Sequence, residues 1–419
     1  MCPADDVEAE SFLSTKRWFP KHPELGPPNQ MPMEPFVSEE QFALEREHLW
    51  PHVWLMVGRV EEIAEPGDYL VKEIPTNHVS LIVVRGRDGV IRAFHNICSH
   101  RGAPVCWEKS GGTGTAAAFR CPYHGFTFGL EGKLQFVPDE ENFYDLDKSK
   151  MGLKPVALDT WEGFIFVHLD PNPRETLKEY LGGVIDGFEG YPFQTESYYY
   201  EYKAVIDCNW KVLIAGFVES FHGSSLHSGA AKFYGGPTNP FRHTMFIKLL
   251  EKHRLINIYV RPDRTPTKFS AIAFARYKRA MERHGQDSDS TAEAADVTKA
   301  FKAITSRPYI LHNVFPNFQP VVRDGMWYYH QFWPLAADKV LWEIRYYYEK
   351  PRNATEAFYQ YFNRVVSRDN VIEDGNVCQR SQWALKSGLI DHWTLTDEEI
   401  AIQHLNKVIA DYTHAQGAP

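Results

Sequence analysis

The hydrophobic and polar positions between Val53 and Asp170 follow the pattern of a small β domain. Apolar positions alternate with polar ones in short runs, and turn signals such as Asp88-Gly89 and Glu131-Gly132 separate the runs, as in β-hairpins. The strands predicted on this basis are Leu81–Val84, Val90–Phe94, Phe119–Phe128, Lys133–Val137 and Trp161–Leu169. Asp170-Pro171-Asn172-Pro173 then ends the last strand and predicts a domain boundary near residue 172.

Beyond this boundary the pattern mixes strands with helices. The predicted strands are Tyr198–Ile206 and an antiparallel pair, Trp327–Trp333 with Val340–Glu349. Apolar residues recur at helical spacing over about 209–222, and the charged, Ala-rich residues 275–304 predict solvated helices. Capping boxes predict two further helices, one from Ser38 to about Trp50 and one that follows Thr396-x-x-Glu399.

These elements predict an α+β chain with three parts. Residues 1–45 form an N-terminal segment that packs on the larger domain, and residues 46–172 form the small all-β domain. Residues 173–419 form the larger domain, in which helices cover an antiparallel sheet.

Charge and composition exclude several classes of partner. The 419 residues carry 45 basic and 54 acidic side chains without a basic block, which argues against nucleic acid. No apolar run is long enough to cross a membrane, and the N-terminus lacks the features of a signal peptide. Six cysteines scattered over a chain of this length suggest metal thiolates in a reducing compartment, so we expect a cytoplasmic protein.

Cys98-x-His100 and Cys121-x2-His124 form the first candidate metal site. Two cysteines and two histidines suit either zinc or a Rieske-type [2Fe–2S] cluster. Structural zinc sites commonly space their first two ligands by two to four residues, whereas a single residue separates Cys98 from His100. Each pair also offers one thiolate and one imidazole, which allows the four side chains to serve two irons.

The residues around these pairs resemble a known family. C-x-H-R-G followed by C-P-Y-H-G-aromatic is similar to the Rieske motif of the Rieske non-heme iron oxygenases. Phe126 stands where the family commonly has Trp, and Ser110–Gly114 lengthens the segment between the pairs. The resemblance implies one [2Fe–2S] cluster per subunit, bound by Cys98, His100, Cys121 and His124.

The second candidate metal site is the segment Glu219–His227. Glu219 and His222 lie three residues apart and would share one face of the predicted helix. His222 and His227 would be about 140° apart on a regular helix, so they share a metal only if the helix opens near Gly223-Ser224-Ser225. Two histidines with a carboxylate from elsewhere form the facial triad of non-heme Fe(II) oxygenases.

This segment also resembles the family, whose catalytic motif is D-x-x-H-x4-H. Glu219 replaces the Asp, which in the family bridges between a metal-bound His and a cluster-bound His of the neighbouring subunit, and Ala215 replaces a frequent Asn. Val371–Asn376 resembles the late acidic element that supplies the third iron ligand. The resemblance therefore implies one Fe(II) per subunit on His222, His227 and Asp374, with Glu373 and Asp369 as alternatives to Asp374.

The family resemblance implies a terminal oxygenase α subunit with a helix-grip-like catalytic domain. Electrons from NAD(P)H would arrive through a reductase, with or without a ferredoxin, and pass from the cluster to the iron across the interface of a head-to-tail homotrimer. There O2 would hydroxylate, dihydroxylate or demethylate a hydrophobic substrate, first of all an aromatic or polycyclic one. Apolar candidates for its pocket are Phe217, Phe221, Leu226, Phe315, Phe318 and Phe332.

Three alternatives remain open at this point. Glu219 and the abundance of aromatic rings also resemble family members that act on quaternary ammonium compounds such as betaine or carnitine. A Rieske electron carrier without chemistry of its own would need only the residues up to about 170. Glu219-x-x-His222 with Glu45-Arg46-Glu47-His48 also matches the E-x-x-H pairs of di-iron helical bundles, which need four long helices.

Overall fold

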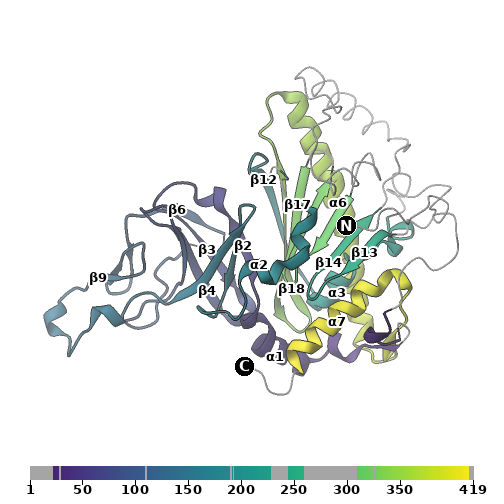
Figure 1. The fold of residues 1–419 in the computed structure, drawn as a ribbon, viewed down its shortest axis with the longest axis horizontal. Helices are drawn as coiled ribbons and strands as arrows, with labels where there is room; N and C mark the ends of the chain where they lie inside the picture. Colours follow the sequence, from purple (N-terminus) through teal and green to yellow (C-terminus); the bar gives the residue numbers. More distant parts are fainter. Residues whose placement is uncertain are drawn as a thin grey trace. The chain divides into compact units, whose positions relative to one another are not determined.

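The computed structural model describes residues 22–27, 30–108, 111–188, 191, 193–227, 244–258, 309–323 and 326–414 (Figure 1). The chain divides into two compact units, Ala43–Tyr180 and the combination of Met1–Phe42 with Leu181–Pro419. The borders expected from sequence, after residues 45 and 172, remain predictions. The helices predicted over 275–304 lie outside the described residues.

The unit Ala43–Tyr180 is built on a seven-stranded antiparallel sheet in the order β2-β11-β10-β5-β4-β3-β6. The hairpin predicted at Asp88-Gly89 is confirmed, because β4 and β5 pair on either side of it. The strand predicted from Trp161 corresponds to β11, whose partner β10 the sequence pattern did not predict. The strands are β2 (Leu55–Arg59), β3 (Asp68–Ile74), β4 (Val79–Arg85), β5 (Ile91–His95), β6 (Thr113–Thr115), β10 (Pro155–Trp161) and β11 (Phe164–His168).

A second, three-stranded sheet in this unit consists of β7 (Phe119–Arg120), β8 (Thr127–Phe128) and β9 (Leu134–Phe136). The hairpin at Glu131-Gly132 is confirmed, but the single strand predicted over Phe119–Phe128 is wrong. Gly125 has a φ of +76° and its N–H donates to the Cys121 carbonyl at 3.0 Å. This left-handed conformation, which glycine adopts readily, turns the chain out between β7 and β8.

The larger unit contains a seven-stranded antiparallel sheet in the order β12-β18-β17-β16-β15-β14-β13 (Figure 1). The predicted strand Tyr198–Ile206 is β12, and the predicted pair around residues 336–338 is β17 with β18. The bounds are β12 (Tyr198–Ile206), β13 (Thr244–Leu249), β14 (Arg254–Ile258), β15 (Tyr309–Asn313), β16 (Phe318–Arg323), β17 (Met326–Ala336) and β18 (Lys339–Tyr348).

Two long helices belong to this unit, α6 (Ala354–Leu385) and α7 (Ile400–Thr413). The predicted capping box of Thr396 and Glu399 is present ahead of α7, whose Leu405, Val408 and Ile409 are buried. The sequence pattern did not predict α6. This helix packs on β12 and β18 through Gly375, where a Cβ would lie 3.1 Å from Trp342 Cζ3 and 3.6 Å from Ile206 Cδ1 (Figure 1).

The helix predicted over 209–222 is wrong in its length. Asn209 caps the helix α3 (Trp210–Ala215), which ends at Gly216. The Phe217 carbonyl accepts a hydrogen bond from Gln319 Nε2 of β16 at 2.8 Å. In a longer helix this carbonyl would accept a backbone N–H of the next turn, so the sheet replaces the helical hydrogen bond. A separate 3-10 helix, η13 (Phe221–Ser224), follows. Glu219 and His222 therefore do not share a continuous helix.

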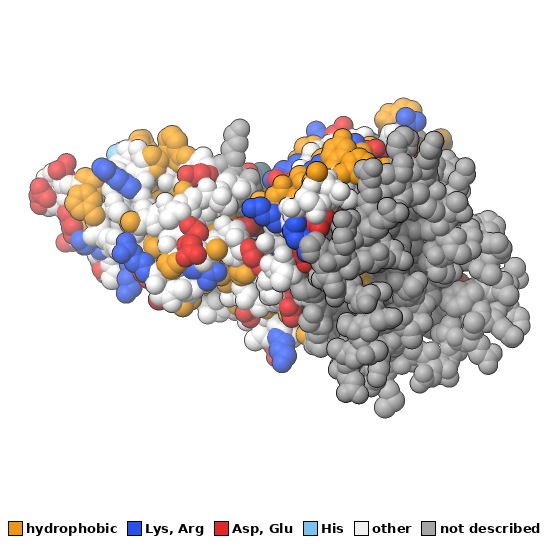
Figure 2. Space-filling model, turned by 90° about the horizontal axis from the view of Figure 1, so that it is seen from above, with side chains coloured by type: hydrophobic (Ala, Val, Ile, Leu, Met, Phe, Trp, Pro, Cys, Tyr) orange, Lys and Arg blue, Asp and Glu red, His pale blue; other side chains and the backbone are white. Residues whose placement is uncertain are grey.

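Near the N-terminus, β1 (Met31–Pro32) pairs with β19 (His392–Trp393) of the larger unit. The helix predicted from Ser38 begins as α1 (Glu39–Leu44) and continues as one π turn (Glu45–Leu49) and one 3-10 turn (Trp50–His52). The short α2 (Leu177–Leu181) lies where the two units divide. Of the helices described, none has the length and apolarity that a membrane crossing needs. On the face that Figure 2 shows, basic and acidic side chains of the described residues are interspersed.

Candidate active site

The two candidate cluster loops have closely similar backbones. The N–H of Gly102 donates to the Cys98 carbonyl at 2.9 Å, just as that of Gly125 donates to the Cys121 carbonyl. Cys98 and Cys121 are buried, and the N–H of each also donates to the backbone of its own loop. Each loop thus closes tightly on its own cysteine and presents its histidine beyond it.

The four predicted cluster residues come together at the ends of these loops. The His100 and His124 ring centroids are 4.7 Å apart, and Phe126 stacks on His100 with an interplanar angle of 4°. Burial raises the pKa of the Cys98 thiol, as does its contact with Cys121. His100 Nδ1 is buried without a hydrogen-bond partner among the described residues. Two adjacent thiols and an unsatisfied imidazole nitrogen suit a metal cluster.

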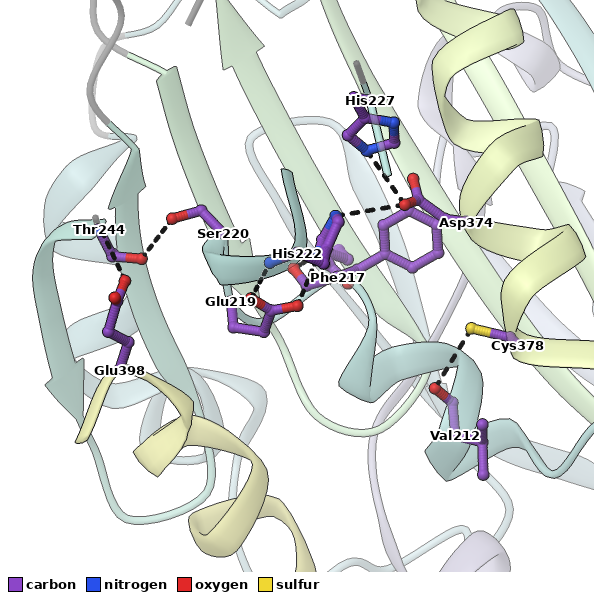
Figure 3. Close-up of polar contacts among 11 residues, drawn as sticks. Val212, Phe217, Glu219, Ser220, His222, His227, Thr244, Asp374, Cys378 and Glu398 are labelled. Carbon is purple, nitrogen blue, oxygen red and sulfur yellow. Dashed lines mark hydrogen bonds and ion pairs between the residues drawn. The ribbon is translucent and has the colours of Figure 1, made fainter. Parts of the chain in front are cut away.

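The second predicted site is assembled from three elements of the larger unit (Figure 3). His222 lies in η13, His227 lies in the turn that follows, and Asp374 lies on α6. The Oδ1 atom of Asp374 is 3.3 Å from His222 Nε2 and 3.2 Å from His227 Nε2. The ligand atoms of these three residues lie within 4.8 Å of one another. The expected opening of the helix does occur, although it begins at Gly216 rather than at Gly223.

Glu219 holds His222 from the side opposite Asp374 (Figure 3). One Glu219 oxygen accepts the backbone N–H of His222 at 3.2 Å, and the other contacts His222 Nδ1. The neighbouring hydroxyl of Ser220 bonds to Thr244 Oγ1 at 2.8 Å, and the N–H of Thr244 donates to Glu398 Oε2 at 3.1 Å. These bonds connect the loop before η13 to β13 and to the C-terminal part of the chain.

Charge complementarity makes this pocket favourable for a cation. Burial opposes the imidazolium form of His222, but Asp374 and Glu219 outweigh it and raise the pKa of His222 to about 10. Burial likewise opposes the charged form of His227, yet Asp374 and Glu373 raise its pKa. Despite its burial, Asp374 has a lowered pKa because both histidines stabilise its carboxylate. Positive charge is therefore stabilised where the three side chains meet.

The same atoms have the spacing of iron ligands. A first-row metal about 2.1 Å from two ligands at right angles holds them about 3.0 Å apart, close to the distances at Asp374 Oδ1. That oxygen is buried and makes no hydrogen bond of good geometry with any described residue. An iron bound to His222, His227 and Asp374 would satisfy it, so the residues present fit the metal.

Asp374 and its two alternatives differ in burial and in their contacts. Asp374 is buried, whereas Glu373 and Asp369 are exposed on α6. Asp369 forms an ion pair with Arg368 at 2.6 Å. Glu373 Oε2 instead contacts His227 Nδ1 at 2.8 Å, on the ring edge away from Asp374. Sequence reasoning missed this contact, for which the only signal was the position of Glu373 beside Asp374.

The predicted pocket residues have different surroundings. Phe217 is buried and stacks on His330 at 4.6 Å. Phe315 stacks on Tyr412 of α7, which indicates a packing role. His330 itself is buried and accepts a hydrogen bond from Trp342 Nε1 at 3.1 Å. Of the remaining candidates, Phe318 and Phe332 are buried. Phe221 is exposed, and Leu226 is partly exposed.

Each of the two units matches a known protein family. Residues 193–415, more than half of the chain, match the family "Ring hydroxylating alpha subunit (catalytic domain)", and residues 53–158 match "Rieske [2Fe-2S] domain". Fold and site thus define a protein that joins a Rieske iron–sulfur domain to a mononuclear iron domain. The chain belongs to the ring-hydroxylating alpha subunit family, and its cofactors are a [2Fe–2S] cluster and a mononuclear iron. The zinc alternative is wrong.

The electron-carrier and di-iron alternatives also fail. A Rieske carrier would lack the matched catalytic domain. A di-iron bundle needs four long helices, whereas α6 and α7 are the only helices longer than ten residues in the described ranges.

Individual relatives divide between two kinds of oxygenase. The glycine betaine monooxygenase oxygenase subunit of Chromohalobacter salexigens is 36% identical over 46% of this chain and 42% of its own length. The large oxygenase component of the naphthalene 1,2-dioxygenase system of Pseudomonas aeruginosa is 37% identical over 47% of this chain and 45% of its own length. The aligned part of this chain thus spans about half the length of these curated relatives.

A solved structure shows the same fold over nearly the whole chain. The quaternary ammonium Rieske monooxygenase CntA superimposes with a TM-score of 0.71 at 20% identity, over 94% of this chain and 100% of that one. The α+β fold predicted from sequence, with an antiparallel catalytic sheet covered by helices, is confirmed.

Proposed function

We propose that this chain is the terminal oxygenase subunit of a multicomponent oxygenase. The observation that carries the proposal is the convergence of His222, His227 and Asp374, with Glu219 behind His222. Two imidazoles and one carboxylate on one side of a metal form the facial triad, which leaves coordination positions open. Iron bound there supplies the activation of O2 beside an organic substrate.

We assign the [2Fe–2S] cluster to Cys98, His100, Cys121 and His124, and the iron to His222, His227 and Asp374. The buried cysteines would hold one iron of the cluster, and the two histidines would hold the other at the ends of their loops. Glu219 would orient His222 through Nδ1 and serve as the bridging carboxylate toward the cluster of a neighbouring subunit. The position of Glu219 on the ring edge away from Asp374 supports this role.

The proposed partners follow from the separation of the cluster, which receives electrons, from the iron, which would activate O2. Electrons from NAD(P)H would reach the cluster through a reductase, with or without a ferredoxin. A homotrimer would bring the cluster of one subunit to the iron of the next. A cytoplasmic location fits the cysteines, because all five in the described part of the chain are free and buried.

Two substrate classes have support. The glycine betaine monooxygenase relative, together with Glu219 at the bridging position, favours a quaternary ammonium compound. The naphthalene dioxygenase relative and the apolar ring of Phe217, five residues before His222, favour an aromatic or polycyclic compound, the basis for a role in aromatic catabolism. The first class predicts demethylation by mono-oxygenation, and the second also allows cis-dihydroxylation.

The test is substrate-dependent O2 consumption with purified chain, NADH and a surrogate ferredoxin and reductase. Glycine betaine, carnitine, naphthalene and biphenyl represent the two classes, and products are identified by mass spectrometry. We expect about three irons per chain, namely two in the cluster and one at the second site. His227→Ala should keep the cluster absorbance and lose both the third iron and the turnover. A wild-type chain with two irons and no O2 consumption on any compound would contradict the proposal.

A further inference from the structure

The two histidines of the proposed iron site are held in the same way. Each ring turns Nε2 toward Asp374 Oδ1, at 3.3 Å for His222 and 3.2 Å for His227. Each Nδ1 contacts a glutamate, which is Glu219 for His222 and Glu373 for His227. Since a carboxylate only accepts hydrogen bonds, both histidines donate through Nδ1. Glu219 has its proposed role as the bridging group, whereas Glu373 has none so far.

We propose that Glu373 is a positioning residue that fixes His227 as an iron ligand, an inference that rests on the proposed iron site. By accepting the Nδ1 hydrogen at 2.8 Å, Glu373 selects the tautomer with a free lone pair on Nε2. It also fixes the rotation of the ring, so Nε2 points to the place where Asp374 Oδ1 faces His222. A carboxylate partner of this kind raises the basicity of a metal-bound imidazole.

Helix geometry explains why consecutive residues of α6 serve opposite edges of one ring. Neighbouring side chains on a helix diverge by about 100°. Asp374 is buried and lies next to Nε2 of His227, while Glu373 is exposed and reaches Nδ1 from outside. One rigid helix therefore supplies both an iron ligand and the group that orients a second ligand. His227 itself lies in a turn, where such support from a helix limits the motion of the ring.

The two glutamates differ in exposure, which makes their roles separable. The Glu219 side chain is 7% exposed and that of Glu373 is 47% exposed. Removing the Glu373 carboxylate therefore leaves no cavity in the core, so its effects report on His227 rather than on folding. Asp369 is a matched control, because it is also an exposed acid on α6 and pairs with Arg368 instead of a histidine.

The first measurement is the dissociation constant for Fe(II) at the mononuclear site, from competition with a chelator while the cluster absorbance is monitored. Loss of a hydrogen-bond partner behind a metal-bound histidine commonly weakens metal binding by about 10–100-fold. We expect a loss of this size for Glu373→Ala. Glu373→Gln, whose amide oxygen still accepts the Nδ1 hydrogen, should lose less. Asp369→Asn should bind Fe(II) as the wild type does.

The second measurement follows the Nδ1 hydrogens themselves, in protein whose mononuclear site holds Co(II). Each histidine bound through Nε2 gives a shifted, exchangeable Nδ1–H resonance in the proton NMR spectrum. In Glu373→Ala the His227 resonance should broaden or vanish through exchange with water, and the His222 resonance should remain. A merely structural effect of the substitution would change both resonances or neither.

The outcomes separate this inference from the proposed function. A wild-type chain that binds no third iron would overturn the proposed iron site and the inference with it. Three irons in the wild type, with unchanged Fe(II) affinity and both resonances intact in Glu373→Ala, would overturn the inference alone. Weaker Fe(II) binding with selective loss of the His227 resonance supports it.

Discussion

The Nε2 atom of His227 lies 3.2 Å from the Oδ1 atom of Asp374, although the histidine belongs to the turn after η13 and the aspartate to the buried side of α6. The pairing depends on α6 lying directly against the sheet, which Gly375 permits at Trp342. The metal site is thus a consequence of how one helix packs, and substitutions can test the ligands and the packing separately.

Asp374→Asn should abolish the mononuclear site and preserve the cluster. The amide keeps the shape of the side chain but removes the negative charge that faces both imidazoles. We expect turnover to fall by more than about 100-fold, which is more than is common when a residue that hydrogen-bonds to a metal ligand is lost. Iron analysis should give about two irons per chain, with the cluster spectrum unchanged. Asp369→Asn serves as the control, and retention of the third iron in Asp374→Asn would reject the assignment.

Glu219→Ala should separate iron binding from electron delivery. Glu219 contacts His222 at Nδ1 as Glu373 contacts His227, so its loss leaves all three proposed ligands in place but should weaken Fe(II) binding. We therefore compare turnover at saturating Fe(II), where we expect both metals to be present. Product formed per electron should fall by about 10–100-fold, because the bridge to the neighbouring cluster is gone. Glu219→Asp, which carries the carboxylate common in the family, should restore part of the turnover. Unchanged product formation by the alanine variant, with both metals present, would show that Glu219 is no bridge.

Gly375→Val should weaken the iron site through packing. A Cβ at this position would lie 3.1 Å from Trp342 Cζ3, so the larger side chain pushes α6 from the sheet and moves Asp374. Overpacking of this kind commonly costs about 1–3 kcal/mol. We expect a lower melting temperature and weaker Fe(II) binding. Asn376→Val places the same β-branched residue on the exposed side of the helix, and equal losses in the two variants would indicate an effect of helix propensity only.

His330→Gln should change how the free energy of unfolding depends on pH. Burial lowers the pKa of His330 to about 3, far below the ordinary value near 6.5, although Asp374 opposes the shift. Below pH 6.5 the unfolded chain therefore binds a proton that the folded chain does not. The stability from neutral His330 is complete above pH 6.5 and is lost as the pH falls toward 3.

The measurement is urea unfolding between pH 7 and 5. The free energy of unfolding of the wild type should fall more steeply than that of His330→Gln, by up to about 1.4 kcal/mol per pH unit. Glutamine is the suitable replacement, because its amide oxygen can accept the hydrogen bond from Trp342 Nε1. Parallel curves for the two proteins would show that His330 does not contribute to acid sensitivity.

The sequence by itself determined the local chemistry of this protein. The cluster loops carry their own ligands and glycines, so the C-x-H and C-x2-H pairs predict a metal site that the folded loops then bring together. The sequence pattern predicted β12 and the β17–β18 hairpin. The two hairpin strands are rich in aromatic residues, which favour β-structure, and they are buried over nearly their whole length. His222 and His227 were recognisable because both lie in one short segment.

Tertiary structure decided what depends on contacts between distant segments. The helix predicted over 209–222 ends at Ala215. The carbonyl of Phe217, two residues later, accepts a hydrogen bond from Gln319 of β16 instead of a helical N–H. The pattern of α6 is concealed because polar residues such as Glu356, Gln360 and Gln382 occupy its buried positions. Only the packing of that helix shows that Asp374 reaches both histidines, whereas its neighbour Glu373 supports one of them from behind. The two acids carry the same kind of charged group, so composition does not separate them. They point in different directions from one helix, and so Asp374 contacts Nε2 of His227 while Glu373 contacts Nδ1.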